Sequence, residues 1–167
     1  MMAFCPFASD TPCGEFVSNT FSVQERGLEN PQRSEPEHIT RFTQAERYEL
    51  SPGADFRDLF AGHFGAVGIC GGYGRFEPGA SLPCHVHKFD ESITIVEGKA
   101  TCLVQGKQYL ASGYDTAFIP EGHPHRFLNE SGNTMAMIWV YAGSEPERTL
   151  VDPGYCSGTI LWPKAHD

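Results

Sequence analysis

Between His38 and Ala142 the sequence is a succession of short runs rich in β-branched and aromatic residues, separated at close intervals by glycine, proline and asparagine. These runs are too short for ordinary helices, and the residues between them favour tight turns. Many short strands joined by turns form an antiparallel sandwich or barrel. We therefore predict an all-β fold, with which the 18 glycines and 12 prolines among 167 residues agree.

The expected elements follow from this alternation of runs and turns. Only one segment, residues 43–47, has the pattern of a helix, and it is short. Hairpin turns are predicted at three places, namely Gly98-Lys99, Gly106-Lys107 and residues 129–132. Strands are predicted near residues 38–41, 47–51, 56–60, 65–77, 83–87, 91–97, 100–105, 108–111, 115–119, 125–129 and 134–142.

The chain divides into three parts that differ in sequence pattern. Residues 1–36 show no clear period, and we interpret them as an N-terminal arm, with a strand given to a partner subunit as the alternative. Residues 37–143 form the predicted β-barrel domain. Residues 144–167 carry three prolines and are predicted to be an irregular tail that packs on the outside of the barrel.

Charge and hydropathy exclude several classes of partner. The 21 acidic residues against 12 basic ones give a formal charge of −9, which argues against nucleic acid or an anionic membrane as the main partner. The longest apolar run, residues 135–142, is too short to span a bilayer and suits a buried strand. The N-terminus also lacks the pattern of a secretory signal. We therefore predict a cytoplasmic protein.

Six cysteines are scattered along the chain without a C-x-x-C pair. Without an export signal, they are expected to be reduced thiols. A disulfide between two of them is the alternative. A glycine-rich run at residues 68–74 resembles a phosphate-binding loop, but it lacks the following Lys-Ser/Thr and a helix, so we interpret its glycines as points of close backbone contact in a strand.

The segment CHVHKFDE places candidate metal ligands together. On a strand, His85 and His87 leave from the same face, about 6.7 Å apart along the chain. A short link then leads to Glu91, which opens the next predicted strand. Two imidazoles and one carboxylate that converge inside an apolar barrel would be three ligands of a divalent metal ion.

A second His-any-His sequence occurs in PEGHPHRFLN, but its two histidines are not equivalent. Proline is tolerated at the start of a strand, so a strand can begin at Pro124. Such a strand places His125, Phe127 and Asn129 on one face. His123 lies inside the preceding turn, where alternation predicts no direction. We therefore expect one more ligand, His125, while His123 is expected to be a turn residue exposed to solvent.

These two segments resemble the two motifs of the cupin superfamily. The first motif has Gly79, His85, His87, Glu91 and Gly98 at every expected spacing, and the second has Gly113, Pro120, Gly122, His125 and Asn129, with six residues rather than five between Gly113 and Pro120. The resemblance implies an antiparallel double-stranded β-helix (the cupin jelly-roll barrel) with a metal held by three histidines and one glutamate. Only one copy of the motifs is present, so the second His-any-His is not an internal repeat.

The resemblance implies one divalent transition metal but not its identity. Nitrogen and oxygen ligands suit iron, manganese, nickel, copper or zinc, and we favour iron or manganese. We hypothesise an enzyme that acts on a small oxygen-rich substrate, either by dioxygenase-type oxidation or by isomerase, lyase or decarboxylase chemistry. The alternative is a non-catalytic module that binds or senses a small ligand. No residue is predicted as the general base, and a homodimer is expected. The candidates to contact substrate or to orient the ligands are Asn129, Tyr73, Phe118 and Trp139.

Overall fold

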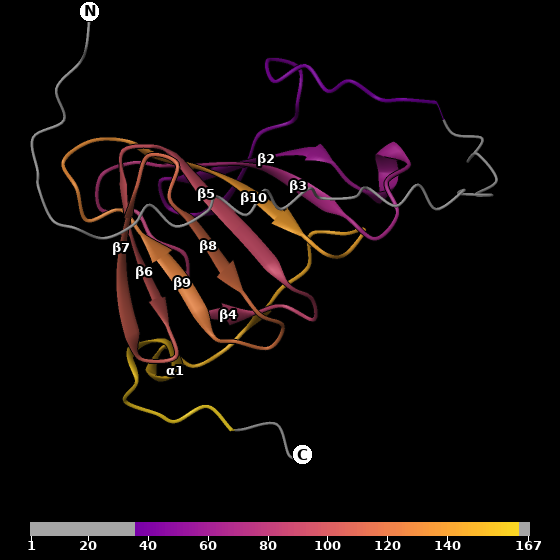
Figure 1. The fold of residues 1–167 in the computed structure, drawn as a ribbon. Helices are drawn as coiled ribbons and strands as arrows, with labels where there is room; N and C mark the ends of the chain where they lie inside the picture. The colour runs from indigo at the N-terminus through magenta and orange to yellow at the C-terminus, as the bar shows by residue number, and fades with distance from the viewer. Residues whose placement is uncertain (1–35, 164–167) are drawn as a thin grey trace, which may run out of the picture. The chain divides into compact units, whose positions relative to one another are not determined.

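The computed structural model describes residues 36–163, and these form two antiparallel β-sheets that pack face to face (Figure 1). The predicted arm at residues 1–36 therefore lies almost entirely outside the described residues. The six-stranded sheet has the order β1 (Tyr48–Ser51), β2 (Ala54–Phe60), β3 (Cys70–Phe76), β10 (Met135–Tyr141), β5 (Glu91–Glu97) and β8 (Thr116–Ile119). The five-stranded sheet has the order β11 (Thr149–Leu150), β4 (His85–Val86), β9 (His125–Leu128), β6 (Lys99–Val104) and β7 (Lys107–Ser112).

The chain winds through both sheets as a double-stranded ribbon. Strand β5 pairs with β10 in the larger sheet, and the strands that continue from them, β6 and β9, pair with each other in the smaller sheet. Antiparallel pairs that pass from one sheet to the other in this way form the predicted jelly-roll barrel. The fold class expected from the sequence is therefore confirmed.

Two of the three predicted hairpins are instead crossings between the sheets. Gly98 joins β5 to β6 with a φ of +69°, and a Cβ at this position would lie 2.3 Å from the carbonyl oxygen of Thr134. Residues 129–132 likewise lead from β9 to β10. The turn between β6 and β7 is a true hairpin, since Val104 pairs with Lys107 and both Gln105 and Gly106 have positive φ.

The core lies between the sheets and is built from the inward-facing positions of the strands. Strand β10 contributes Met135, Met137 and Trp139, which are at most 2% exposed. Gly72 on β3 pairs with Trp139, and a Cβ on it would lie 2.5 Å from the Cζ2 atom of that indole. The glycines of residues 68–74 thus include positions where an aromatic ring packs directly on the backbone, as expected of strand glycines.

The structure corrects three predicted elements. Residues 38–41 form no strand, and the helix expected at 43–47 is replaced by a turn at 42–44. A 3₁₀ helix, η1 (Gly62–Phe64), and an irregular stretch precede β3, so the strand expected from residue 65 begins at Cys70. The C-terminal tail is more ordered than expected, because it adds strand β11 to the smaller sheet and forms the short helix α1 (Pro153–Ser157).

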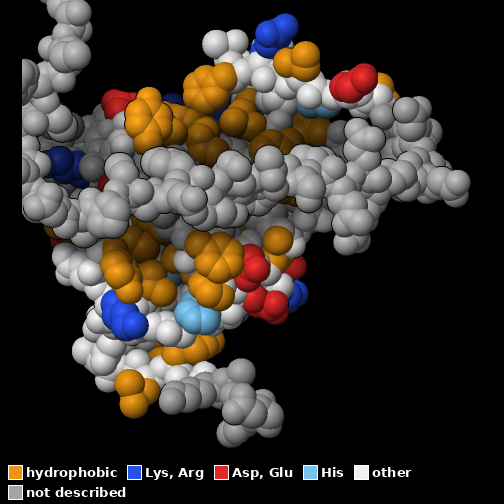
Figure 2. Space-filling view, viewed as in Figure 1, with side chains coloured by type: hydrophobic (Ala, Val, Ile, Leu, Met, Phe, Trp, Pro, Cys, Tyr) orange, Lys and Arg blue, Asp and Glu red, His pale blue; other side chains and the backbone are white. Residues whose placement is uncertain are grey.

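Several large hydrophobic side chains remain on the surface. Leu110 on β7 and Phe118 on β8 are 80% and 64% exposed, and Figure 2 shows that hydrophobic side chains gather on the face in view. Within residues 36–163, no helix has the length and apolar character needed to cross a membrane.

Candidate metal centre

Four side chains from three strands and one loop meet at one end of the barrel. His85 on β4 is the direct register partner of His125 on β9, while His87 follows β4 and Glu91 begins β5. All four side chains are at most 5% exposed. One possible ligand atom from each lies within 4.8 Å of those of the others. The structure thus brings together the four residues that the sequence predicted as ligands.

Backbone carbonyls orient the three imidazoles. The Nδ1 atom of His85 is 2.8 Å from the carbonyl oxygen of Pro83, and that of His125 is 2.8 Å from that of His123. The Nδ1 atom of His87 is 2.6 Å from the carbonyl oxygen of Glu147 in the C-terminal segment. A carbonyl only accepts hydrogen bonds, so each Nδ1 carries a proton, and a neutral ring then keeps its lone pair on Nε2. This is the arrangement that metal-binding histidines require.

The atoms that face the centre of the cluster have no other use in the fold. Nε2 of His87, Nε2 of His125 and Oε2 of Glu91 are buried, and none makes a hydrogen bond of acceptable geometry with residues 36–163. Oε2 of Glu91 lies 2.7 Å from Nε2 of His125 and 3.5 Å from Nε2 of His87. Buried polar atoms without partners are costly, and a cation among them would satisfy all three. The donor set therefore fits a divalent metal ion.

The environment keeps two of the imidazoles neutral in the metal-free protein. Burial, followed by the charge of His125, lowers the pKa of His85 to about 2. Burial also lowers the pKa of His87, although Glu91 opposes this. Burial also acts to lower the pKa of His125, but the proximity and negative charge of Glu91 outweigh burial, so the pKa of His125 is raised. Neutral imidazoles with free lone pairs are ready to bind a metal ion without first losing a proton.

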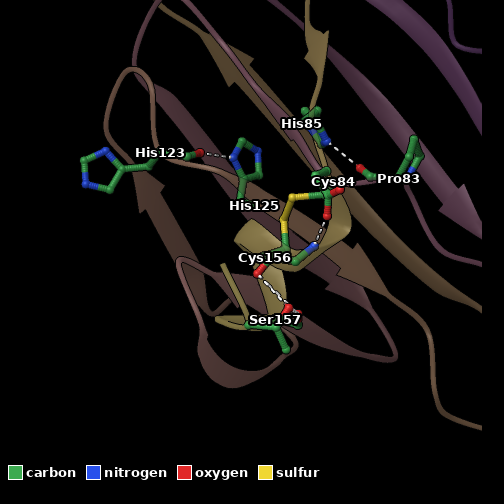
Figure 3. The surroundings of a disulfide bond; sticks show 10 residues. Pro83, Cys84, His85, His123, His125, Cys156 and Ser157 are labelled. Carbon is green, nitrogen blue, oxygen red and sulfur yellow. Dashed lines mark hydrogen bonds between the residues drawn. A yellow bond between two sulfur atoms is a disulfide. The ribbon is translucent and has the colours of Figure 1, made fainter. Parts of the chain in front are cut away.

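A disulfide joins Cys84, next to the ligand His85, to Cys156 on α1 (Figure 3). The expectation that all cysteines are reduced is therefore wrong for this pair, because the sequence does not show that the tail folds back beneath β4. Cys70 and Cys102 are free and buried, and burial raises the pKa of each thiol to about 12. Disulfides are rare in the cytosol, so the bond does not favour the cytoplasmic location that we predicted.

His123 does not join the cluster. Its imidazole is half-buried and points away from His125, while its backbone carbonyl accepts the hydrogen bond from Nδ1 of His125 (Figure 3). His123 therefore acts on the site through its backbone rather than through its ring. Pro124 separates the two histidines and is fully buried, which fixes the point at which β9 begins.

Asn129 is fully buried but is occupied in holding loops together. Its amide nitrogen donates hydrogen bonds to the carbonyl oxygens of Phe76, Glu77 and Asn133, and its side-chain oxygen accepts from Ser131. These hydrogen bonds are thus those of an asparagine that holds a turn, and none of them reaches the four clustered side chains.

Of the other three residues expected near the substrate, only Trp139 lies beside the cluster, in the wall of a cavity that His87 also lines. Tyr73 follows Gly72 on β3 and so faces the outside of the sheet, where its ring packs edge-on against Phe42. Phe118 is exposed on β8. Strand alternation thus places Tyr73 and Phe118 away from the site.

Tyr141 belongs to the site, although the sequence did not single it out from the other core aromatics. It pairs in register with Glu91, and its ring centroid is 4.4 Å from that of His87. Burial, and then the charge of Glu91, raise the pKa of Tyr141 well above its usual value. The phenol therefore keeps its proton. Its position two residues after Trp139, on the same face of β10, is the signal that would have identified it.

A cavity of about 240 Å³ adjoins the cluster and is bounded by His87, Trp139, Tyr141 and the segment that contains Arg148. A larger cavity, of about 690 Å³, lies near the C-terminal tail and is lined by none of the four cluster residues. We take the smaller cavity as the approach to the site, because it alone of the two touches a candidate ligand.

Comparison with known proteins identifies the domain. The cupin domain family matches residues 72–141, which contain all four clustered residues. The chain is also 34% identical over 116 residues to quercetin 2,3-dioxygenase from Bacillus subtilis (strain 168). The match covers 64% of this chain but only 32% of that relative.

Solved structures share the fold. The polyketide cyclase RemF from Streptomyces resistomycificus superimposes with a TM-score of 0.62 at 22% identity, over 74% of this chain and 91% of its own. An RmlC-like cupin from Shewanella frigidimarina superimposes with a TM-score of 0.58 at 20% identity, over 67% of this chain and 95% of its own. At these identities the likeness establishes the fold alone. With both motifs, the barrel and the family match in agreement, residues 72–141 form a cupin domain.

Proposed function

We propose that the protein is a metal-dependent enzyme that oxidises a small oxygen-rich molecule with dioxygen. The observation that carries the proposal is the set of buried, unpartnered donor atoms of His87, Glu91 and His125 that converge with His85. The similarity to a quercetin 2,3-dioxygenase supports oxidation over the other chemistries of the fold, although this chain spans about a third of that protein. A bound iron or manganese ion would supply Lewis acidity and, with dioxygen, redox chemistry.

The protein's own contribution begins with the ligands. His85, His87 and His125 would bind through Nε2, because each Nδ1 is held by a carbonyl oxygen, and Glu91 would bind through its carboxylate. Three neutral imidazoles and one carboxylate leave a divalent ion with a net charge near +1. Such a site favours an anionic oxygen of the substrate.

Tyr141 and the cavity walls would act on the substrate itself. The Tyr141 phenol, whose pKa burial raises, remains a hydrogen-bond donor at neutral pH and is placed beside Glu91 and His87. Trp139 closes the inner wall of the cavity with its indole ring.

Elemental analysis of protein purified without an affinity metal column would test the metal. We expect about one divalent ion per chain in the wild type and much less in a His125→Ala variant. Oxygen uptake would then be followed with a panel of catechols, flavonols such as quercetin, diketones, thiols and sugar acids. Uptake that requires the metal supports the proposal. Metal-loaded protein that consumes no oxygen but isomerises or cleaves a panel member would refute the oxidation and favour Lewis-acid chemistry.

Three further expectations remain predictions about the whole protein. We propose a homodimer, with a small molecule as its main partner and a cytoplasmic location. Analytical ultracentrifugation would test the dimer directly. Fractionation of cells that express the protein would test the location, to which the disulfide between Cys84 and Cys156 gives no support.

A further inference from the structure

The cavity beside the cluster contains a positive charge that the metal centre does not need. Among the residues that line it, Arg148 is the only lysine or arginine, and its side chain is half-buried. Within residues 36–163, the Arg148 guanidinium makes no hydrogen bond and has no carboxylate within ion-pair distance. A partly buried arginine without a partner costs free energy unless a ligand supplies the anion.

The acidic residues of the cavity are engaged elsewhere. Asp58 accepts a hydrogen bond from the hydroxyl of Tyr48 at 2.5 Å. Glu147 faces Lys88, with 3.5 Å between its carboxylate and the ammonium nitrogen. Neither carboxylate is within 4.0 Å of Arg148, so its guanidinium is available for a ligand.

Arg148 is held at a set position relative to the candidate ligands. The residue before it, Glu147, binds Nδ1 of His87 through its carbonyl oxygen at 2.6 Å. Two residues after it, Leu150 on β11 pairs in register with His85. The backbone on both sides of Arg148 is therefore tied to the cluster, which limits the freedom that an anion-binding side chain would have to lose.

The charge of Arg148 reaches the cluster. Burial lowers the pKa of His85 and of His87 and raises that of Tyr141, and the positive charge of Arg148 acts to lower all three. His87, Tyr141 and Arg148 line one cavity of about 240 Å³, so one small molecule bound there can touch Arg148 and the metal centre together.

We propose that Arg148 is the specificity-determining residue of this cavity, and that the substrate is a small carboxylic acid whose carboxylate binds the guanidinium while a second oxygen reaches the metal centre. The planar fork of an arginine matches a carboxylate with two parallel hydrogen bonds. A cavity of about 240 Å³ is below the usual range of about 300–1,000 Å³ for ligand pockets, so it favours a short acid. This inference rests on the proposed metal-dependent function.

The test uses the manganese-loaded full-length chain and four acid and amide pairs: acetate, lactate, malonate and succinate, with acetamide, lactamide, malonamide and succinamide. Calorimetric titration at pH 7 would measure the affinity of each for the wild type and for Arg148→Ala, Arg148→Lys and Arg75→Ala. Arg75 is the matched control, because it pairs with Glu77 and does not line the cavity.

We expect Arg148→Ala to weaken binding of the best acid at least tenfold, while its amide binds all variants alike. The affinity of Arg148→Lys for the acid should lie between those of the wild type and Arg148→Ala, because lysine keeps the positive charge but lacks the planar guanidinium. Arg75→Ala should bind the acid as tightly as the wild type does. Equal affinity of the acid for wild type and Arg148→Ala, or no binding of any acid to the loaded wild type, would overturn the inference. Manganese content, measured on the same samples, separates these results from a failure of the metal site itself.

Discussion

Removal of the disulfide between Cys84 and Cys156 is expected to destabilise the domain by about 4 kcal/mol. The bond joins residues 72 positions apart, and the loop-entropy relation for a loop of this length predicts a stabilisation of about 4 kcal/mol. Both cysteines are at most 2% exposed, so the Cys84→Ala/Cys156→Ala double variant also leaves a small cavity in the core. The effect should be a large fraction of the 5–15 kcal/mol that typical domains possess.

Urea unfolding of the metal-free protein, followed by tryptophan fluorescence, would measure this loss. The phosphine reductant TCEP should destabilise the wild type by a similar amount and leave the double variant unchanged, which separates loss of the bond from loss of side-chain packing. Mass spectrometry of a non-reduced digest would establish the pairing independently. A wild type that proves to be disulfide-bonded, yet loses less than about 1 kcal/mol on reduction, would refute the entropic argument.

Removal of the disulfide is also expected to affect the metal centre. Cys84 precedes His85, and the tail that it anchors supplies the Glu147 carbonyl that orients His87. Removal of groups that orient ligands typically lowers metal affinity 10–100-fold. We therefore expect the double variant to bind manganese more weakly than the wild type under conditions in which both are folded, as measured by competition with a chelator.

Further predictions concern single residues. His125→Ala should remove most of the bound metal, whereas His123→Ala should retain it, because only the backbone of His123 contacts the site; equal losses in elemental analysis would contradict the assignment. The folded-state pKa of His85 is about 2 and the unfolded value is about 6.5, so only the unfolded chain takes up this proton as the pH falls from about 6 to 4.5. This proton alone should cost the metal-free protein about 1.4 kcal/mol of stability per pH unit, and His87, whose pKa is also lowered, adds to the slope in the same direction; a urea series without such a slope would refute it. His125, whose pKa is raised, is protonated in both states over that window and adds no slope. Asn129→Ala should cost about 2–4 kcal/mol in thermal or urea unfolding, since it leaves three buried or half-buried carbonyl groups without a donor, while metal content per folded chain stays unchanged.

The ligand set could be predicted from the sequence because strand alternation is a local rule. His85 and His87 share a face on any strand, independently of contacts with distant residues. Pro124 starts the strand that carries His125. The same rule explains the weaker predictions. Tyr73 and Phe118 were named as candidates without their parity being settled, and the structure places both on outward faces.

Pairing between distant segments could not be predicted in this way. The turns at Gly98 and at residues 129–132 resemble hairpins locally, but they connect different sheets, and the choice depends on which strands the flanking residues meet. The tail was expected to be irregular, because its prolines say nothing of the register that brings Leu150 to His85 or of the bond from Cys156 to Cys84.

The sequence by itself thus determined an all-β barrel and the four side chains that converge in it, because both depend on the period of a single strand and on spacing within short motifs. Only the tertiary structure decided that the C-terminal segment closes over the site, where it brings a carbonyl to His87, a sulfur to Cys84 and a guanidinium to the cavity. The reason is physical: these contacts join residues 60 or more positions apart, and burial and pairing across the whole domain, rather than local preference, select them.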